Sequence, residues 1–244
     1  MTNRQRIDRL LVERGLFDSR AKAQAAIEAG LVIANDAVVR KASEEIPTDA
    51  RLRATPAHPF VSRGGVKLAA ALEHFDFDPL GRVCLDVGAS TGGFTQVLLE
   101  RGARRIYAID VGREQLHESL RGDAAVVSLE QTDIRKLSPA LLNDPPDFVT
   151  IDVSFISLKL ALPPTLALVK MPAHLVALIK PQFEAGPAHL KKGIMRDAGV
   201  RAAVCAEISA FVTSLGWRVV GVIPSPISGG DGNAEFLLGA SSHD

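Results

Sequence analysis

Four apolar runs of this chain are each followed by an aspartate, and this repeated pattern restricts the fold more than any other feature of the sequence. The aspartates are Asp86, Asp110, Asp133 and Asp152. About twenty residues separate each from the next, which matches the crossover that joins two parallel strands. In open α/β sheets, ligands bind beyond the carboxyl ends of the strands. The pattern therefore predicts a parallel sheet with four carboxylates along its ligand-binding edge.

Alternating strand-like and helical segments extend this pattern from residue 62 onwards. The predicted strands are Arg82–Val87, Arg105–Asp110, Ala124–Leu129, Phe148–Asp152, Leu175–Lys180, Trp217–Ile223 and Ala234–Leu238. The predicted helices are Val66–Phe75, Gly93–Arg101, Arg113–Leu120, Leu158–Val169 and Asp197–Leu215. Seven strands that end in a hairpin predict an α/β fold with the Rossmann-like sheet typical of methyltransferases that use S-adenosylmethionine (SAM).

The first 54 residues predict a separate, small α+β module. Its predicted elements are the helices Arg6–Arg14 and Arg20–Ala29, the hairpin strands Leu31–Ala34 and Ala37–Val39, and a further strand at Ile46–Arg53. Asn35-Asp36 is a two-residue hairpin signal, and Asp18 or Ser19 can cap the second helix. Two prolines at residues 55–61 predict a stiff linker. We therefore expect domains at 1–54 and 62–244.

The composition is that of an ordinary globular protein, with 47% hydrophobic and 23% charged residues. The formal net charge is +0, so a nucleic-acid surface would need local clusters of Lys and Arg. Cys84 and Cys205 match no metal-ligand spacing, and we expect no metal site. Lys, Pro and His interrupt the most apolar stretch, Leu158–Ile179, and the first residues lack an apolar signal segment. We therefore expect a cytoplasmic protein, favour a monomer, and expect no stable membrane insertion.

The segment after Asp86, Gly88-Ala89-Ser90-Thr91-Gly92-Gly93, is a glycine-rich turn without the dinucleotide-binding spacing G-x-G-x-x-G. Glycines let a backbone approach a ligand closely, and a helix that begins near Gly93 offers free N–H groups to a carboxylate. A ligand with ribose hydroxyls, an amino group and a positive centre suits this row of acceptors, and SAM has all three. The alternative is a tight turn without a ligand.

These observations give a set of candidate SAM-binding residues. Asp110 is expected to accept from the ribose hydroxyls and Asp133 from the adenine amino group. Taken alone, each could equally be a solvated or helix-capping aspartate, and Phe94 alone could be a core residue. The full set is Asp86, Gly88, Ser90, Gly92, Gly93, Phe94, Asp110, Asp133 and Asp152.

Four charged residues, Lys67, Asp152, Lys180 and Glu235, are candidates for the catalytic side of the site. Lys180 ends an apolar strand and must find a partner there, and Asp152 ends the neighbouring strand. Glu235 is the only charge in its run, and the Arg63-Gly64-Gly65 turn can bring Lys67 to the sheet edge. The alternatives are an ordinary surface lysine at Lys67 and a purely structural ion pair between Lys180 and Asp152.

These four residues resemble the Lys-Asp-Lys-Glu tetrad of the FtsJ-type ribose 2′-O-methyltransferases. The wider motifs are similar to those of the TlyA family, whose members are described as ribosomal-RNA cytidine 2′-O-methyltransferases and in some cases as haemolysins. The segments that carry this resemblance are Phe60–Leu68, Asp86–Thr95, Asp152–Leu158 and Ile179–Glu184. Residues 6–32 resemble the S-four RNA-binding module of ribosomal proteins.

The resemblance implies that Lys180 is the residue nearest to the target 2′-hydroxyl. A neutral lysine could take its proton, and a charged one could orient the oxygen, and the sequence leaves both roles open. It also implies ribosomal RNA as the partner, held by the first domain. The candidate RNA-binding residues are Arg4, Arg6, Arg9, Ser19, Arg20, Lys22 and Arg63. A membrane-active haemolysin and an inactive ribosome-binding protein are the competing hypotheses.

Overall fold

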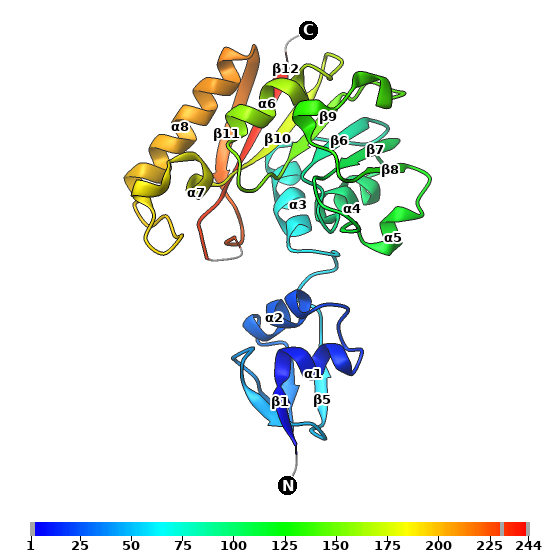
Figure 1. Ribbon diagram of the computed structural model, residues 1–244, viewed down its shortest axis with the longest axis vertical. Coiled ribbons are helices and arrows are strands. Elements are labelled where there is room, and N and C mark those ends of the chain that lie inside the picture. The colour runs from blue at the N-terminus through cyan, green and yellow to red at the C-terminus, as the bar shows by residue number, and fades with distance from the viewer. Residues whose placement is uncertain (1–2, 230–231, 243–244) are drawn as a thin grey trace. The chain divides into compact units, whose positions relative to one another are not determined.

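The computed structural model describes residues 3–229 and 232–242, and the chain divides into two compact units, Met1–Ser62 and Arg63–Asp244 (Figure 1). Residues 55–63 form no helix or strand. The linker at 55–61 and the domain limits derived from it stay predictions.

The smaller unit contains two short helices and two small sheets. The helices are α1 (Ile7–Glu13) and α2 (Arg20–Glu28), and the strands are β1 (Arg4–Arg6), β2 (Val32–Ala34), β3 (Ala37–Val38), β4 (Glu45–Pro47) and β5 (Leu52–Ala54). β1 pairs with β4, and β2 lies between β3 and β5. Ile7, Leu11 and Ile27 are among the side chains that form its core. This confirms the predicted α+β module.

The β2–β3 hairpin forms where the Asn35-Asp36 signal predicts it. Both residues have a left-handed backbone, with φ of 46° and 67°, which suits the tight turn of a two-residue hairpin. The predicted single strand Ile46–Arg53 is wrong, because the chain turns after Pro47 and forms two strands in different sheets. The Arg14 guanidinium donates to the carbonyl oxygens of that turn.

The larger unit has a seven-stranded sheet in the order β11-β12-β10-β9-β6-β7-β8. Its strands are β6 (Val83–Val87), β7 (Arg105–Ile109), β8 (Val126–Leu129), β9 (Phe148–Ile151), β10 (His174–Ile179), β11 (Trp217–Pro224) and β12 (Phe236–Ser242). β6 to β10 are parallel, and β12 is antiparallel to both β10 and β11. The predicted seven-stranded sheet with a final hairpin is confirmed.

Helices cover both faces of this sheet (Figure 1). The helices are α3 (Gly64–Phe75), α4 (Gly93–Glu100), α5 (Glu118–Arg121), α6 (Leu158–Leu166), α7 (Pro181–Glu184) and α8 (Ala198–Ser214), with short 3-10 turns at Ile134–Lys136, Pro139–Leu141 and Pro187–His189. α6 and α8 pack on one face, and α3 and α4 pack on the other.

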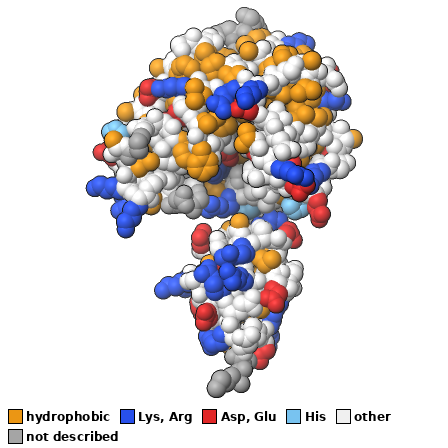
Figure 2. Space-filling view, in the orientation of Figure 1, with side chains coloured by type: hydrophobic (Ala, Val, Ile, Leu, Met, Phe, Trp, Pro, Cys, Tyr) orange, Lys and Arg blue, Asp and Glu red, His pale blue; other side chains and the backbone are white. Residues whose placement is uncertain are grey.

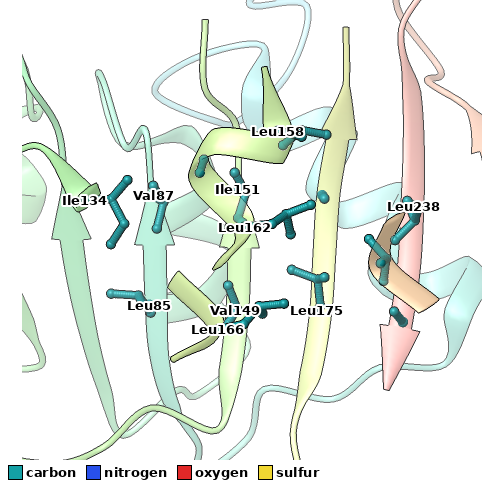
Figure 3. Close-up of a cluster of buried hydrophobic side chains, with 14 of the residues drawn as sticks. Leu85, Val87, Ile134, Val149, Ile151, Leu158, Leu162, Leu166, Leu175 and Leu238 are labelled. Carbon is teal, nitrogen blue, oxygen red and sulfur yellow. The ribbon is translucent and has the colours of Figure 1, made fainter. Parts of the chain in front are cut away.

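The core between α6 and the sheet follows from the two periodicities of helix and strand. Leu158, Leu162 and Leu166 lie one above the other along α6 and point at alternate residues of the strands, such as Val149 and Leu175 (Figure 3). The intervening strand residues point to the other face, towards α3 and α4. Residues just beyond the strands follow the same alternation, and Glu235, which precedes Phe236 of β12, pairs with Lys67 of α3.

The predicted helix Arg113–Leu120 is wrong over most of its length, because only Glu118–Arg121 is helical. The carboxylate of Glu130 accepts hydrogen bonds from the backbone N–H groups of Gln115 (2.8 Å) and Leu116 (2.9 Å), which fixes this segment as a loop. Glu114 has a positive φ of 54°, which no helix allows. The side chain of Glu130, the residue after β8, therefore supplies the hydrogen-bond acceptors that backbone carbonyl oxygens would supply in a helix.

Candidate active site

A cavity of about 520 Å³ opens at the carboxyl ends of β6, β7 and β9. This volume lies within the usual range of small-molecule sites. Five of the predicted SAM-binding residues line it, namely Gly88, Ser90, Asp110, Asp133 and Asp152. The remaining walls are largely apolar and include Ile109, Ile134 and Ile156. The cavity therefore combines apolar surface with three carboxylates from three different strand ends.

The other four candidates, Asp86, Gly92, Gly93 and Phe94, do not line this cavity. Phe94 is buried at the start of α4 and belongs to the core. Gly92 has φ of 97°, and a Cβ there would meet the side chains of the α5 segment. These residues shape the turn into α4.

Asp86 is fully buried within β6 and joins three elements. Its carboxylate accepts from the Oγ1 hydroxyls of Thr95 in α4, at 2.6 Å, and Thr150 in β9, at 2.9 Å. Burial raises the pKa of Asp86 to about 6, although both hydroxyl donors act in the opposite direction. Asp86 therefore fastens β6 to its neighbours behind the cavity wall.

Position 88 must be glycine because the backbone at Asp152 leaves no room for a Cβ atom. Its φ is 84°, and a Cβ atom there would lie 2.4 Å from the carbonyl oxygen of Asp152. The sequence pattern predicts a close approach to a ligand at this glycine, whereas the closest approach observed is between the ends of β6 and β9. Only glycine allows Asp152 to take its position at the cavity wall.

Asp110 and Asp133 are held as acceptors by nearby donors. Asp110 accepts from the backbone N–H groups of Ser90 (2.8 Å) and Gly112 (2.7 Å). Asp133 pairs with the guanidinium of Arg135 at 2.6 Å, which lowers the pKa of Asp133 to about 2. Each carboxylate oxygen has more than one lone pair, so each can accept a further bond from a ligand.

The four candidate catalytic residues form two ion pairs, in which Lys67, Lys180 and Glu235 are buried and Asp152 is partly buried. Lys67 Nζ in α3 lies 2.5 Å from Glu235 Oε2, just before β12. Lys180 Nζ, just after β10, lies 2.6 Å from Asp152 Oδ1 and donates to Ser154 Oγ at 2.8 Å. Lys67, Lys180 and Glu235 are 8%, 8% and 5% exposed, so Lys67 is not an ordinary surface lysine.

Strand register brings the two ion pairs to one edge of the sheet. Ile179 of β10 lies opposite Phe236 of β12, so the next residues outward, Lys180 and Glu235, are neighbours across the two strands. Asp152 belongs to one pair and also lines the cavity, which joins the tetrad to the cavity. Two amines and two carboxylates from four distant segments therefore meet beside a ligand-sized space.

Sequence reasoning missed three residues of this region. Ser154 accepts from Lys180 and lines the cavity, and its position two residues after Asp152 was the available signal. Glu130 holds the loop that carries Gln115 to the cavity wall, and no local pattern marks it. Phe155 has φ of 66° and an 87% exposed side chain next to the tetrad.

In the smaller unit, a buried aspartate organises two of the candidate RNA-binding residues. Asp8 accepts from Arg6 at 3.0 and 3.1 Å and from Arg20 at 2.7 Å, and it also accepts from Gln24 at 3.1 Å. The Arg6 guanidinium, followed by Arg20, holds the pKa of Asp8 well below its usual range. The two arginine side chains stay 39% and 49% exposed, so their outer edges face solvent.

The other candidates in this unit have more local contacts. Lys22 pairs with Asp18 at 2.9 Å, Arg4 donates to the carbonyl oxygen of Glu45, and Ser19 caps α2 by accepting from the Lys22 N–H at 3.4 Å. Arg9 is exposed on α1. Figure 2 shows Lys and Arg side chains gathered on the visible face of this unit. Arg63 belongs to the larger unit, at the N-cap of α3.

Residues 3–229 and 232–242 show neither a membrane-spanning helix nor a metal-binding cluster. No helix in these ranges is both long and apolar enough to cross a membrane. No group of three or more His, Cys, Asp and Glu side chains in the same ranges has an arrangement that could hold a metal ion.

The larger unit, with its sheet order and paired tetrad, matches a known family. The model of the FtsJ-like methyltransferase family matches residues 60–242, which is most of the chain. The chain belongs to the FtsJ-like methyltransferase family. The model of the S4 domain matches residues 5–52, in agreement with the S-four resemblance of the first helices.

Full-length relatives support this assignment. This FtsJ-like methyltransferase is 44% identical to the 16S/23S rRNA (cytidine-2′-O)-methyltransferase TlyA of Mycobacterium tuberculosis over 98% of this chain and 90% of that one. A solved structure described as a candidate hemolysin from Streptococcus thermophilus is 40% identical, with a TM-score of 0.79 over 100% of this chain and 90% of that one. A SAM-dependent methyltransferase from Aquifex aeolicus is similar in fold alone, with a TM-score of 0.52, 20% identity, and coverage of 75% and 95%.

Proposed function

We propose that this protein transfers a methyl group from SAM to the ribose 2′-hydroxyl of a cytidine in ribosomal RNA. The observation that carries the proposal is the meeting of two lysine–carboxylate pairs, with both lysines buried, at the edge of a ligand-sized cavity. The 44% identical relative, whose name gives it this reaction, supports the choice of substrate. The S4 match supports RNA as the partner.

The cavity has the chemistry that SAM requires. Asp110 and Asp133 offer oxygen acceptors for hydroxyl and amino groups, and the isoleucine walls suit a flat purine ring. Asp152 provides negative charge where a sulfonium would gain from it. When bound, SAM supplies the methyl group on a positively charged sulfur.

Lys180 acts in its charged form and orients the 2′-oxygen. Its Nζ atom contacts Asp152 Oδ1 and donates to Ser154 Oγ, and a charged amine has a third N–H left for another acceptor. That N–H donates to the 2′-oxygen and fixes one of its lone pairs towards the methyl group. The hydroxyl proton passes to the carboxylate of Asp152, the acceptor in contact with Lys180. Lys67 and Glu235 form the neighbouring ion pair along the sheet edge, and their opposite charges balance each other.

RNA binding belongs to the smaller unit and to exposed groups near the tetrad. Arg6 and Arg20 each keep free N–H groups outside their contact with Asp8, and these can donate to phosphate oxygens. Arg9 adds a third guanidinium on the same helix as Asp8. The exposed ring of Phe155 offers a face on which an unstacked base can lie.

A methyl-transfer assay tests the proposal. Purified protein is incubated with methyl-labelled SAM and ribosomal subunits that lack ribose methylation, and the RNA is mapped by mass spectrometry. We expect one or a few 2′-O-methylcytidines, and none with Lys180→Ala protein of wild-type thermal stability. Label on a base instead of a ribose, or undiminished transfer by Lys180→Ala, would falsify the proposal.

A further inference from the structure

The segments that follow the neighbouring parallel strands β9 and β10 contact each other, and both are called loops below. Residues 152–158 follow β9 and residues 180–184 follow β10. Their first link is the contact of Lys180 with the β9 loop described above. A second link follows three residues later along each loop, where the rings of Phe155 and Phe183 lie with their centroids 5.1 Å apart.

A third link has no part in the function proposed so far. Glu184, at the end of α7, accepts from the Ser157 hydroxyl at 2.5 Å through Oε2 and from the Leu158 N–H at 2.8 Å through Oε1. The three links run in the same order along both loops. The loops are therefore joined at both ends, by the catalytic contact at one and by this carboxylate at the other.

We propose that Glu184 is a positioning residue that holds Lys180 in its contact with Asp152, an inference that rests on the proposed function. α7 is a single turn that begins directly after Lys180, and the Phe183 N–H donates to the Lys180 carbonyl oxygen at 2.9 Å. A single turn has little stability of its own. Fixing its last residue to the start of α6 fixes the backbone that carries the Lys180 side chain.

A second role of the same carboxylate has to be separated from this one. The Leu158 N–H is among the first N–H groups of α6, so Glu184 also caps that helix, which stabilises a helix whatever its function. A cap alone would affect the unfolding temperature and leave turnover of the folded enzyme unchanged. A positioning role predicts a loss of turnover in protein that is still folded.

Steady-state kinetics of Glu184→Ala and Glu184→Gln make this separation. With saturating SAM, we expect Glu184→Ala to lower kcat by about tenfold or more, because small displacements of a reacting group have large effects on rate. KM for the RNA should change by less than about threefold, since the RNA-binding residues are untouched. Glu184→Gln should recover most of kcat, because its amide oxygen can still accept from the Leu158 N–H.

A matched control uses another acidic residue tied to α6. Glu207 of α8 pairs with Lys159 of α6 and takes no part in the three links between the loops, so Glu207→Ala should leave kcat unchanged. Wild-type kcat for Glu184→Ala, or an equal loss in Glu207→Ala, would overturn the inference. If Glu184→Ala unfolds at the assay temperature, Ser157→Ala carries the same test with a smaller expected loss. Wild-type protein that methylates nothing would instead reject the proposed function.

Discussion

Lys67 and Glu235 are 168 positions apart in the chain, yet their charged atoms lie 2.5 Å from each other in a buried ion pair. The pair joins α3 to the segment that leads into β12. Because both side chains are largely excluded from water, neither charge can be solvated if its partner is lost. This dependence makes the pair open to a direct test.

Glu235→Ala should destabilise the protein by about 3–5 kcal/mol, because it leaves the Lys67 ammonium buried without a partner. The double variant Lys67→Met, Glu235→Leu should recover most of that loss, since two apolar side chains of similar size need no charge partner. Urea unfolding of the three proteins measures the difference. A single variant as stable as wild type would contradict the buried pair.

Substitutions of Lys180 distinguish an orienting cation from a general base. Lys180→Met should lower kcat by about a hundredfold or more, and Lys180→Arg should keep about ten times more activity than Lys180→Met, because it preserves a charged donor. Single-turnover methylation with both variants measures this. Equal inactivity of the two variants, with wild-type turnover that rises steadily up to pH 9, would favour a neutral lysine that takes the proton.

Gly88→Ala should disturb the cavity without touching its charged groups. The new methyl group meets the Asp152 carbonyl oxygen, and the positive φ adds about 1–2 kcal/mol of strain. We expect a lower unfolding temperature and a loss of SAM affinity, measured by calorimetry. Gly232→Ala is the matched control, because Gly232 also has a positive φ but no atom within 4 Å of its added Cβ. Equal effects of the two substitutions would show that strain alone is responsible.

Asp86 should make the protein less stable as the pH rises. Its pKa of about 6 in the folded protein exceeds the ordinary 3.8, so the folded state binds the proton more tightly than the unfolded state. The contribution of Asp86 therefore falls as the pH rises from about 4 to about 6, by about 3 kcal/mol in total. Asp86→Asn lacks this change. Urea unfolding at several pH values should show wild type losing stability relative to the variant across this window. A constant difference would contradict the raised pKa.

The two arginines around Asp8 should behave non-additively. Arg6→Ala or Arg20→Ala leaves Asp8 with one guanidinium, but the double variant leaves it with Gln24 alone. We expect the double variant to lose about 1–3 kcal/mol more than the sum of the single variants, because a buried carboxylate then lacks a countercharge. The measurement is the free energy of unfolding of residues 1–62, obtained from thermal unfolding of the full chain for the wild type, both single variants and the double variant. Strict additivity would mean that Asp8 is solvated.

The sequence patterns predict the framework well because it depends on periodicity. Alternating apolar runs predict six strands of the large sheet to within about two residues, a usual limit for element boundaries, whereas β12 continues four residues beyond the predicted end at Leu238. The prediction for Arg113–Leu120 fails because the structure of this segment depends on Glu130, which lies at least ten residues away in sequence, just after β8. Contacts of that kind have no local signature.

The candidate site was predictable in part for the same reason. The aspartates at strand ends reach the cavity because parallel strands share one edge, as Asp110 and Asp152 do. Asp86 stands one residue before the end of its strand, and this offset turns its side chain towards α4 and Thr95. The roles proposed for the tetrad and for the RNA-binding residues stay predictions until the variants are measured.

The position of β12 between β10 and β11 has a consequence for how the enzyme is made. The strand that is translated last among the seven enters the interior of the sheet, and the residue just before it supplies the carboxylate for Lys67. A nascent chain in which β12 is still inside the ribosome therefore lacks the carboxylate that pairs with Lys67 in the proposed active site. The proposed active site is therefore complete only once this last strand of the seven has entered the sheet between β10 and β11.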